Sequence, residues 1–146
     1  TDYPNIKFLI STLYHIEEYD IKLYGFPYTS MFNNWAYMLN SNNMKLAVDM
    51  IEECDILISH GPPYGVLDYI IENNKLLSVG CKHLKKQILN IKPKYHIFGH
   101  VHTANTNRGI FKDVDNNITY VNASVVIDEQ FKYPILKPII INYNND

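Results

Sequence analysis

Two short apolar stretches, each followed by histidine and turn-forming residues, constrain this chain more than any other feature. The first runs from Asp55 to His60 and leads into a Gly-Pro-Pro sequence, and the second runs from Tyr95 through Gly99 to His102. An apolar run bounded by turn signals is typical of a buried strand. Because α/β proteins build sites from loops at one edge of a sheet, two strands that each deliver imidazole from their ends predict a metal site at that edge.

The rest of the chain alternates between helical and extended patterns. Apolar residues recur with helical spacing twice, which predicts helices over residues 43–53 and 81–91. The order of strand and helix, followed by a run of strands, predicts a layered α/β sandwich with a mixed sheet and helices outside it. Besides the two stretches above, we expect strands over 6–10, 21–24 and 138–143, a short helix within 64–72, and a hairpin that joins 108–114 to 118–123.

The composition excludes several functional classes. The 146 residues carry a formal net charge of -2 and no basic block, so we expect neither nucleic acid nor an anionic membrane surface as a partner. No apolar run reaches the ~18 residues of a membrane-spanning helix. We expect a cytoplasmic protein in which both cysteines, Cys54 and Cys81, are reduced and buried. Because the sequence starts at Thr1 rather than at methionine, we also expect a fragment or a processed product.

Three of the six histidines are candidate metal ligands. His60, His100 and His102 each lie where a buried strand gives way to a loop, and neutral imidazole binds zinc, iron, nickel and copper. Residues two apart in an extended segment point the same way, so His100 and His102 can be directed at one spot, with Gly99 allowing the backbone to bend before them. We expect no metal-binding role for the others, which are His15, His83 and His96.

An aromatic segment over residues 28–39 follows the strand predicted at 21–24. It contains Phe32, Trp35 and Tyr37 without a period of 2 or 3.6 residues, which favours an irregular loop. Such a loop could line a substrate cleft or cap an edge of the core, and the sequence leaves both open.

Five sequence blocks, in one order along nearly the whole chain, resemble a known family. They lie at residues 23–35, 55–63, 79–81, 93–102 and 120–124. Together they resemble the calcineurin-like metallophosphoesterases, and in particular the branch of small metallophosphoesterase-domain proteins that are similar to class III phosphodiesterases.

The resemblance implies a fold, a reaction and a set of ligands. The fold would be a four-layer αββα sandwich with mixed sheets, and residues 1–146 would be the C-terminal portion of that domain. Two divalent metal ions (Mn, Fe or Zn) would be bound, one by His60 and His100 and the other by His102. A metal-bridging hydroxide would hydrolyse small phosphodiesters such as cyclic nucleotides. More weakly, Tyr28 and Asn122 would lie near the substrate.

Three earlier blocks of that family, D-x-H, G-D-x-x-D and G-N-H-[DE], do not occur in this sequence. Charge leads to the same point, because neutral histidines do not offset the charge of two divalent ions and a bridging carboxylate is needed. The available aspartates precede a strand or lie in turns, and we expect none to be a ligand: Asp55, Asp68, Asp113, Asp115 and Asp128. The chain is therefore predicted to hold only part of a metal site.

Two other functional classes remain open. The chain could be a non-catalytic phosphoesterase module that acts in protein interaction, or its three histidines could bind a single zinc ion with an open fourth position. A sheet without its remaining strands would expose unpaired edges and an apolar face. We therefore expect the chain to need a missing N-terminal half, a partner chain or self-association.

Overall fold

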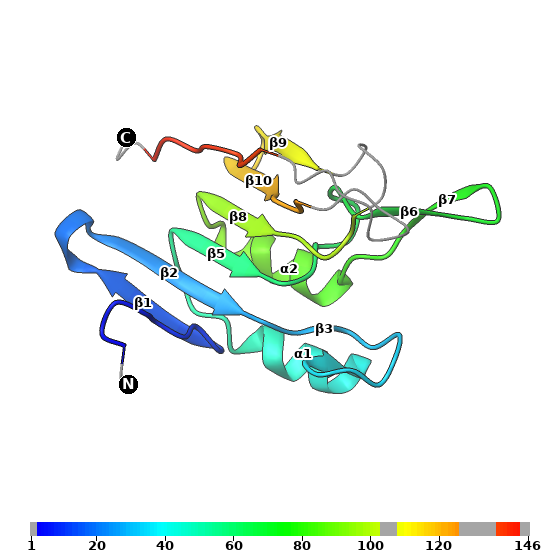
Figure 1. Ribbon diagram of the computed structural model, residues 1–146, viewed down its shortest axis with the longest axis horizontal. Helices are drawn as coiled ribbons and strands as arrows, with labels where there is room; N and C mark the ends of the chain where they lie inside the picture. The colour runs from blue at the N-terminus through cyan, green and yellow to red at the C-terminus, as the bar shows by residue number, and fades with distance from the viewer. Residues whose placement is uncertain (1–2, 103–107, 126–136, 144–146) are drawn as a thin grey trace.

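A six-stranded mixed sheet forms the centre of the computed structural model, which describes residues 3–102, 108–125 and 137–143 (Figure 1). The strand order is β1-β2-β5-β8-β10-β9. β2, β5, β8 and β10 are parallel, so their carboxyl ends lie at one edge, whereas β1 and β9 pair antiparallel on the outside. The strands are β1 Thr12–Ile16, β2 Ile21–Phe26, β5 Ile56–Ser59, β8 Tyr95–Phe98, β9 Gly109–Asp113 and β10 Ile118–Asn122.

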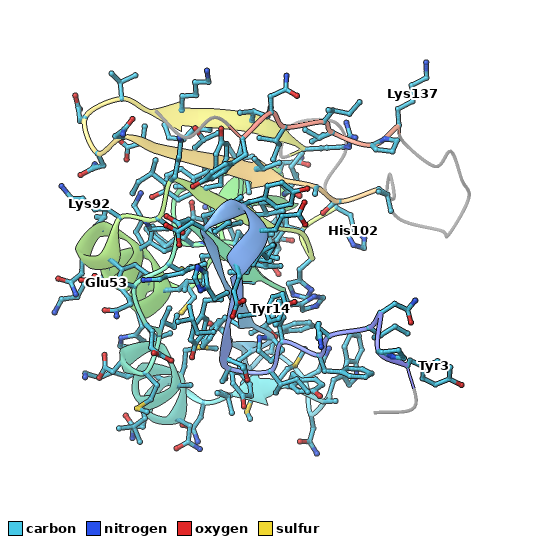
Figure 2. All side chains as sticks on the ribbon, turned by 90° about the vertical axis from the view of Figure 1, so that its left-hand side faces the viewer. Tyr3, Tyr14, Glu53, Lys92, His102 and Lys137 are labelled. Atoms are coloured by element: carbon cyan, nitrogen blue, oxygen red, sulfur yellow. The ribbon has the colours of Figure 1, made fainter. Side chains whose placement is uncertain are left out.

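Two helices, α1 Ser41–Asp49 and α2 Lys82–Ile91, cover one face of the sheet (Figure 2). α1 lies in the connection from β2 to β5 and α2 in the connection from β5 to β8, because parallel neighbours need a crossover. Apolar side chains from the helices and the sheet form one core, whose most buried members are Tyr24, Phe26, Met44, Leu57, Leu84, Ile88, Ile118 and Tyr120.

Local capping explains where these helices begin and end. The Asn40 side chain accepts a hydrogen bond from the Asn43 amide, which starts α1 two residues before the predicted 43–53. The predicted helix also ran too far, because Ile51 is buried in the core but lies beyond the last turn. The helix predicted over 81–91 is confirmed, and it ends where Lys92 adopts a left-handed conformation.

The opposite face of the sheet is only partly covered. Gly25, Ile58, Ile97 and Val121 form a row across it in register. A Cβ at Gly25 would lie 2.3 Å from the Leu9 side chain, so the N-terminal segment crosses this face in close contact. In Figure 2, Tyr3 and Lys137 lie on this side of the sheet, and Glu53 and Lys92 lie on the helix side. Ile58, on the second of the four parallel strands, remains 38% exposed.

Two smaller two-stranded sheets flank the carboxyl-end edge. Thr29–Ser30 (β3) pairs with Met38–Leu39 (β4), so short strands bracket the aromatic segment. Tyr69–Glu72 (β6) and Lys75–Ser78 (β7) form a projecting hairpin (Figure 1). The short helix predicted within 64–72 is therefore wrong. Asn73 and Asn74 both have positive φ, as a two-residue turn between right-twisted strands requires.

Two predicted strands at the ends of the chain are also wrong. Residues 6–10 are irregular, and the edge strand is Thr12–Ile16, which returns on β2 through a tight turn with Asp20 at φ 51°. Residues 138–143 make no ladder; they are held by side-chain contacts such as the Tyr95 hydroxyl, which donates to the Asn142 carbonyl at 3.2 Å. The predicted hairpin is confirmed as β9 and β10.

The predicted α/β class with a mixed sheet is confirmed. Over the described ranges the chain forms one layer of helices and one large sheet, which are two layers of the predicted four-layer sandwich. Among these residues no helix has the length and apolar character needed to cross a membrane. The fold places the carboxyl ends of β5 and β8 side by side. The residues of the predicted site follow these two strands.

Candidate metal centre

His60 follows β5 directly, and backbone hydrogen bonds tie it to both neighbouring strands. Its N–H donates to the Phe26 carbonyl at 3.1 Å, and its carbonyl accepts from the Gly99 N–H at 3.1 Å. The next residue, Gly61, approaches β3 so closely that a Cβ there would lie 3.1 Å from Thr29 Cγ2. The sheet thus continues one residue past its strands and fixes the backbone of His60.

His100 occupies a tight turn at the end of β8. Its φ is 69°, and the Val101 N–H donates to the Gly99 carbonyl at 2.8 Å. A hydrogen bond between residues two apart around a positive φ marks the rare form of the γ-turn. The bend is therefore at His100, not at Gly99 as expected. The expectation that His100 and His102 belong to one extended segment is wrong, because this turn intervenes.

Val101 anchors the loop that carries both histidines. Its side chain is buried, and its carbonyl accepts hydrogen bonds from Asn122 Nδ2 and Ser124 Oγ, both at 3.3 Å. Asn122 is fully buried; its Nδ2 also donates to the Leu67 carbonyl at 3.2 Å, and its Oδ1 accepts from the Ser124 N–H at 3.0 Å. Asn122, expected near the substrate, therefore lies beneath the loop and holds it.

The fold brings His60 and His100 together. Their ring centres are 4.7 Å apart and the rings are tilted by 48°. Two imidazoles bound to one metal ion through ~2.1 Å bonds have ring centres about 4.6–5.3 Å apart for ligand angles of about 90–110°. The spacing of this pair therefore fits ligands that share one ion.

Both rings are kept neutral by their surroundings. Loss of solvent around His60 lowers its pKa, and the nearby His102 lowers it further by charge repulsion. Desolvation likewise lowers the pKa of His100, followed by repulsion from His60 and His102. A neutral imidazole offers the lone pair that a metal ion needs. The same couplings place His102 within electrostatic reach of the pair.

The described residues do not enclose a metal ion by themselves. In the ranges covered by the structure, no group of three or more His, Cys, Asp or Glu side chains converges on one point. Asp55 accepts from a β2 amide at 2.7 Å, and the buried Asp68 accepts from two amides at 3.0 and 2.8 Å. Asp113 and Asp115 lie at the β9–β10 turn, and Asp128 lies outside the described residues. Within the described residues, the histidine pair is therefore not completed into a metal site.

A cleft of about 730 Å³ opens beside the pair and includes His100 and His102 in its lining. One wall is the segment from Tyr28 to Phe32, and the other is the β6–β7 hairpin, with Ile70 and Ile71. The Phe32 ring centre lies 5.7 Å from that of His100. Tyr28, expected near the substrate, does line this cleft.

Sequence reasoning missed two parts of the site. One is the hairpin wall, whose Asn-Asn pair between apolar runs was a turn signal. The other is a buried hydrogen bond of 2.8 Å between Ser59 Oγ and His96 Nε2, directly behind His60. No local sequence pattern predicts this hydrogen bond, because Ser59 and His96 lie on different strands.

His15 and His83 contact other residues, and Cys81 lines the cleft beside the pair. His15 pairs with Asp20 at 2.7 Å on the surface, and His83 contacts Ser41 at 3.2 Å. Both thiols are free and buried, as predicted for Cys54 and Cys81.

Comparisons with known proteins give the chain its relatives. It is 32% identical over 150 aligned residues to "Metallophosphoesterase domain-containing protein 1" of Homo sapiens and to the protein of the same name in Mus musculus; each alignment covers 97% of this chain and 43% of the relative. A UPF0046 protein of Caenorhabditis elegans is 33% identical over 90 residues, which are 60% of this chain and 22% of that protein. No family profile matches the sequence.

The fold has a solved counterpart. One crystal structure superposes with a TM-score of 0.60 at 20% identity, over 85% of this chain and 48% of the other. The chain spans less than half the length of the human and mouse metallophosphoesterase domain-containing proteins. The alignment nevertheless covers nearly all of its own residues, including the strand-end histidines. The chain belongs to the metallophosphoesterase-domain family.

Proposed function

We propose that this chain supplies histidine ligands to the two-metal centre of a phosphoesterase. His60 and His100 would bind one divalent ion, and His102 would bind the second. The observation that carries the proposal is the pair of neutral imidazoles, 4.7 Å apart, at the ends of adjacent parallel strands. Family membership supports the reaction class, which is phosphoester hydrolysis.

The chemistry that such a pair of divalent ions supplies is the activation of water and the neutralisation of charge on phosphoryl oxygens. Mn, Fe and Zn all accept imidazole and remain candidates. The chain's own residues contribute position. The sheet fixes His60, the γ-turn directs His100, and Asn122 holds the loop between His100 and His102.

We further propose small phosphodiesters, such as cyclic nucleotides, as substrates in a cytoplasmic protein. The cleft has apolar and aromatic walls, including Tyr28 and Phe32, and Glu72 is the one carboxylate among its described lining residues. Such walls suit an organic group of low charge better than a polyanion. The free thiols of Cys54 and Cys81 fit a reducing compartment.

The proposal is tested by titrating the chain with Mn²⁺ and Zn²⁺ in a calorimeter and assaying bis(p-nitrophenyl) phosphate and cyclic nucleotides in the same samples. We expect His60→Ala and His100→Ala each to weaken binding of the first ion at least about 10-fold, because each removes one of two paired ligands. His15→Ala is the matched control, since it removes an imidazole outside the site. Unchanged metal affinity in both site variants would refute the ligand assignment.

A non-catalytic module is the second candidate. It is favoured by the incomplete ligand set among the described residues. Metal binding without turnover, both in this chain and in the longer protein, would support this alternative. Turnover that depends on His60 would exclude it. A stoichiometry of one ion with turnover would instead indicate a mononuclear site.

A further inference from the structure

A buried polar pair lies immediately behind the histidine pair. Ser59 is 6% exposed and His96 is fully buried. Ser59 is the last residue of β5, directly before His60, and His96 lies within β8, upstream of His100. Their side chains meet at 2.8 Å between Oγ and Nε2. The contact therefore joins the two strands that carry the proposed ligands.

The hydrogens of this pair can be assigned from its partners. Ser59 Oγ lies 2.7 Å from the Gly61 carbonyl, which can only accept, so the single hydroxyl hydrogen is donated there. The same oxygen must then accept from His96, which places the ring hydrogen on Nε2. Among the described residues, the buried His96 Nδ1 has no hydrogen-bond partner, as expected for an unprotonated nitrogen in a ring that packs against Phe98 and Tyr120.

The direction of these bonds has a consequence for His60. The relay runs from His96 Nε2–H to Ser59 Oγ, and from Ser59 O–H to the carbonyl of Gly61. The bond from Ser59 to Gly61 spans His60, and the backbone of His60 is hydrogen-bonded to the strands on either side. Gly61 also has little room to shift, because it packs against Thr29. These two hydrogen bonds therefore fix the side chain before His60 and the carbonyl after it, in addition to the backbone hydrogen bonds that the sheet makes to His60.

We propose that His96 is a positioning residue for the metal ligand His60, acting through the Ser59 hydroxyl. The effect on metal binding rests on the proposed function, whereas the tautomer and the effect on the His60 ring do not. Partners behind a ligand typically change metal affinity 10–100-fold when they are removed.

The first test is the tautomer of His96, read from long-range ¹H–¹⁵N NMR correlations of the metal-free chain. We expect the Nε2–H form in the wild type. We also expect the His60 ring signals to move in Ser59→Ala and to stay in place in Ser59→Thr, which keeps the hydroxyl. The inference would be overturned if His96 carried its proton on Nδ1, or if the His60 ring signals had the same positions in Ser59→Ala as in the wild type. Either result would count whether or not the chain binds metal.

The second test separates position from stability by Zn²⁺ calorimetry. Ser59→Ala should weaken Zn²⁺ binding about 10-fold or more, and Ser59→Thr should restore it. The double variant Ser59→Ala with His96→Phe also removes the ring N–H of His96 that Ser59→Ala leaves unpaired, so it should be more stable than Ser59→Ala without regaining affinity. Tyr24→Phe removes a buried hydrogen bond to the Met50 carbonyl outside the site and is the control.

The outcomes of the second test distinguish the two proposals. An equal loss of affinity in Tyr24→Phe and Ser59→Ala, or full affinity in the double variant, would show that only stability matters and would overturn the inference. Failure of the wild type to bind Zn²⁺ would count against the proposed function, and the NMR arm would then decide the role of His96.

Discussion

At the scale of single residues, His100 combines a proposed ligand with an unfavourable backbone. Its φ of 69° is uncommon for a residue with a side chain and costs on the order of 1–3 kcal/mol. The surrounding contacts supply the compensation, because Val101 is buried and its carbonyl is bonded by Asn122 and Ser124. The hydrogen bonds to Val101 thus maintain the turn, whereas the backbone conformation of His100 destabilises the turn.

This strain predicts an inverted response to glycine. His100→Gly should be more stable than His100→Ala by about 1 kcal/mol, because glycine adopts positive φ at little cost. Urea unfolding of both variants measures the difference. At Leu46, an exposed position within α1, the Gly variant should instead be less stable than the Ala variant. Equal stabilities of the two His100 variants would contradict the strained turn.

The buried imidazole of His96 predicts a dependence of stability on pH. Burial lowers its pKa to about 3, with a smaller effect from the charge of Lys85. In the unfolded chain the group has a pKa of about 6.5, so below that pH the unfolded state binds a proton that the folded state does not. This contribution to stability is complete above pH 6.5 and declines by about 1.4 kcal/mol per pH unit as the pH falls toward 3.

The variant His96→Gln isolates that contribution, because glutamine does not titrate and can still donate to Ser59. We expect its unfolding free energy, measured by urea titration from pH 7 to pH 4, to fall less steeply than that of the wild type. Parallel curves for the two proteins would contradict a neutral, buried His96.

At this scale the sequence pattern indicated candidate ligands but gave no information about the residues that hold them in place. An apolar run that stops at histidine could be recognised for His60 and for His100, since a strand end is a local pattern. The γ-turn could not be predicted, because its anchor depends on Asn122, on a strand that follows later in the chain. The Ser59–His96 bond likewise requires the register of β5 against β8, which no local spacing encodes.

At the scale of elements, local signals succeeded where caps and turns are clear. The predictions for β5, β8, α2 and the β9–β10 hairpin are confirmed. The helix predicted within 64–72 is wrong, because the apolar residues there form short runs without a decisive period. Tyr69–Glu72 instead forms β6, and the Asn73-Asn74 turn joins it to β7. Residues 6–10 and 138–143 have strand-like composition but lie outside the ladders, since β1 and β9 occupy the two edges of the sheet.

The end of α2 provides an element-scale prediction. Lys92 closes the helix with φ 47°, and its N–H donates to the Ile88 carbonyl at 2.8 Å. Lys92→Gly should stabilise the chain by about 1 kcal/mol, because glycine has no Cβ to strain in the left-handed region. Thermal unfolding measures the change. Lys86→Gly, inside the same helix, should lower stability by a similar amount. A lower melting temperature for Lys92→Gly would contradict the cap geometry.

At the scale of the whole molecule, the two faces of the sheet differ. The helices bury one face along the central strands, whereas the row that contains Ile58 and Ile97 has only partial cover from the N-terminal segment. Exposed apolar surface on a central strand favours association. The chain also spans less than half the length of its curated relatives.

We therefore expect the purified chain to associate in concentrated solution. Ile58→Thr should shift it toward the monomer, because threonine keeps β-propensity and removes apolar surface from the row. Light scattering after size-exclusion chromatography measures the mass. Val114→Thr is the control, since Val114 is 85% exposed beside the β9–β10 turn and away from that row. A wild-type chain that remains monomeric would contradict the open face.

The crossover through α2 also bears on folding. His60 and His100 meet only when β8 lies against β5. Closing such a long loop costs entropy before any contact between the strands compensates for it. An intermediate in which β5 and β8 are not yet paired would not contain the imidazole pair. If these two rings bind a metal ion, the rate at which they bind it during refolding would therefore measure the rate at which β5 and β8 pair. A rapid-mixing experiment could follow that rate.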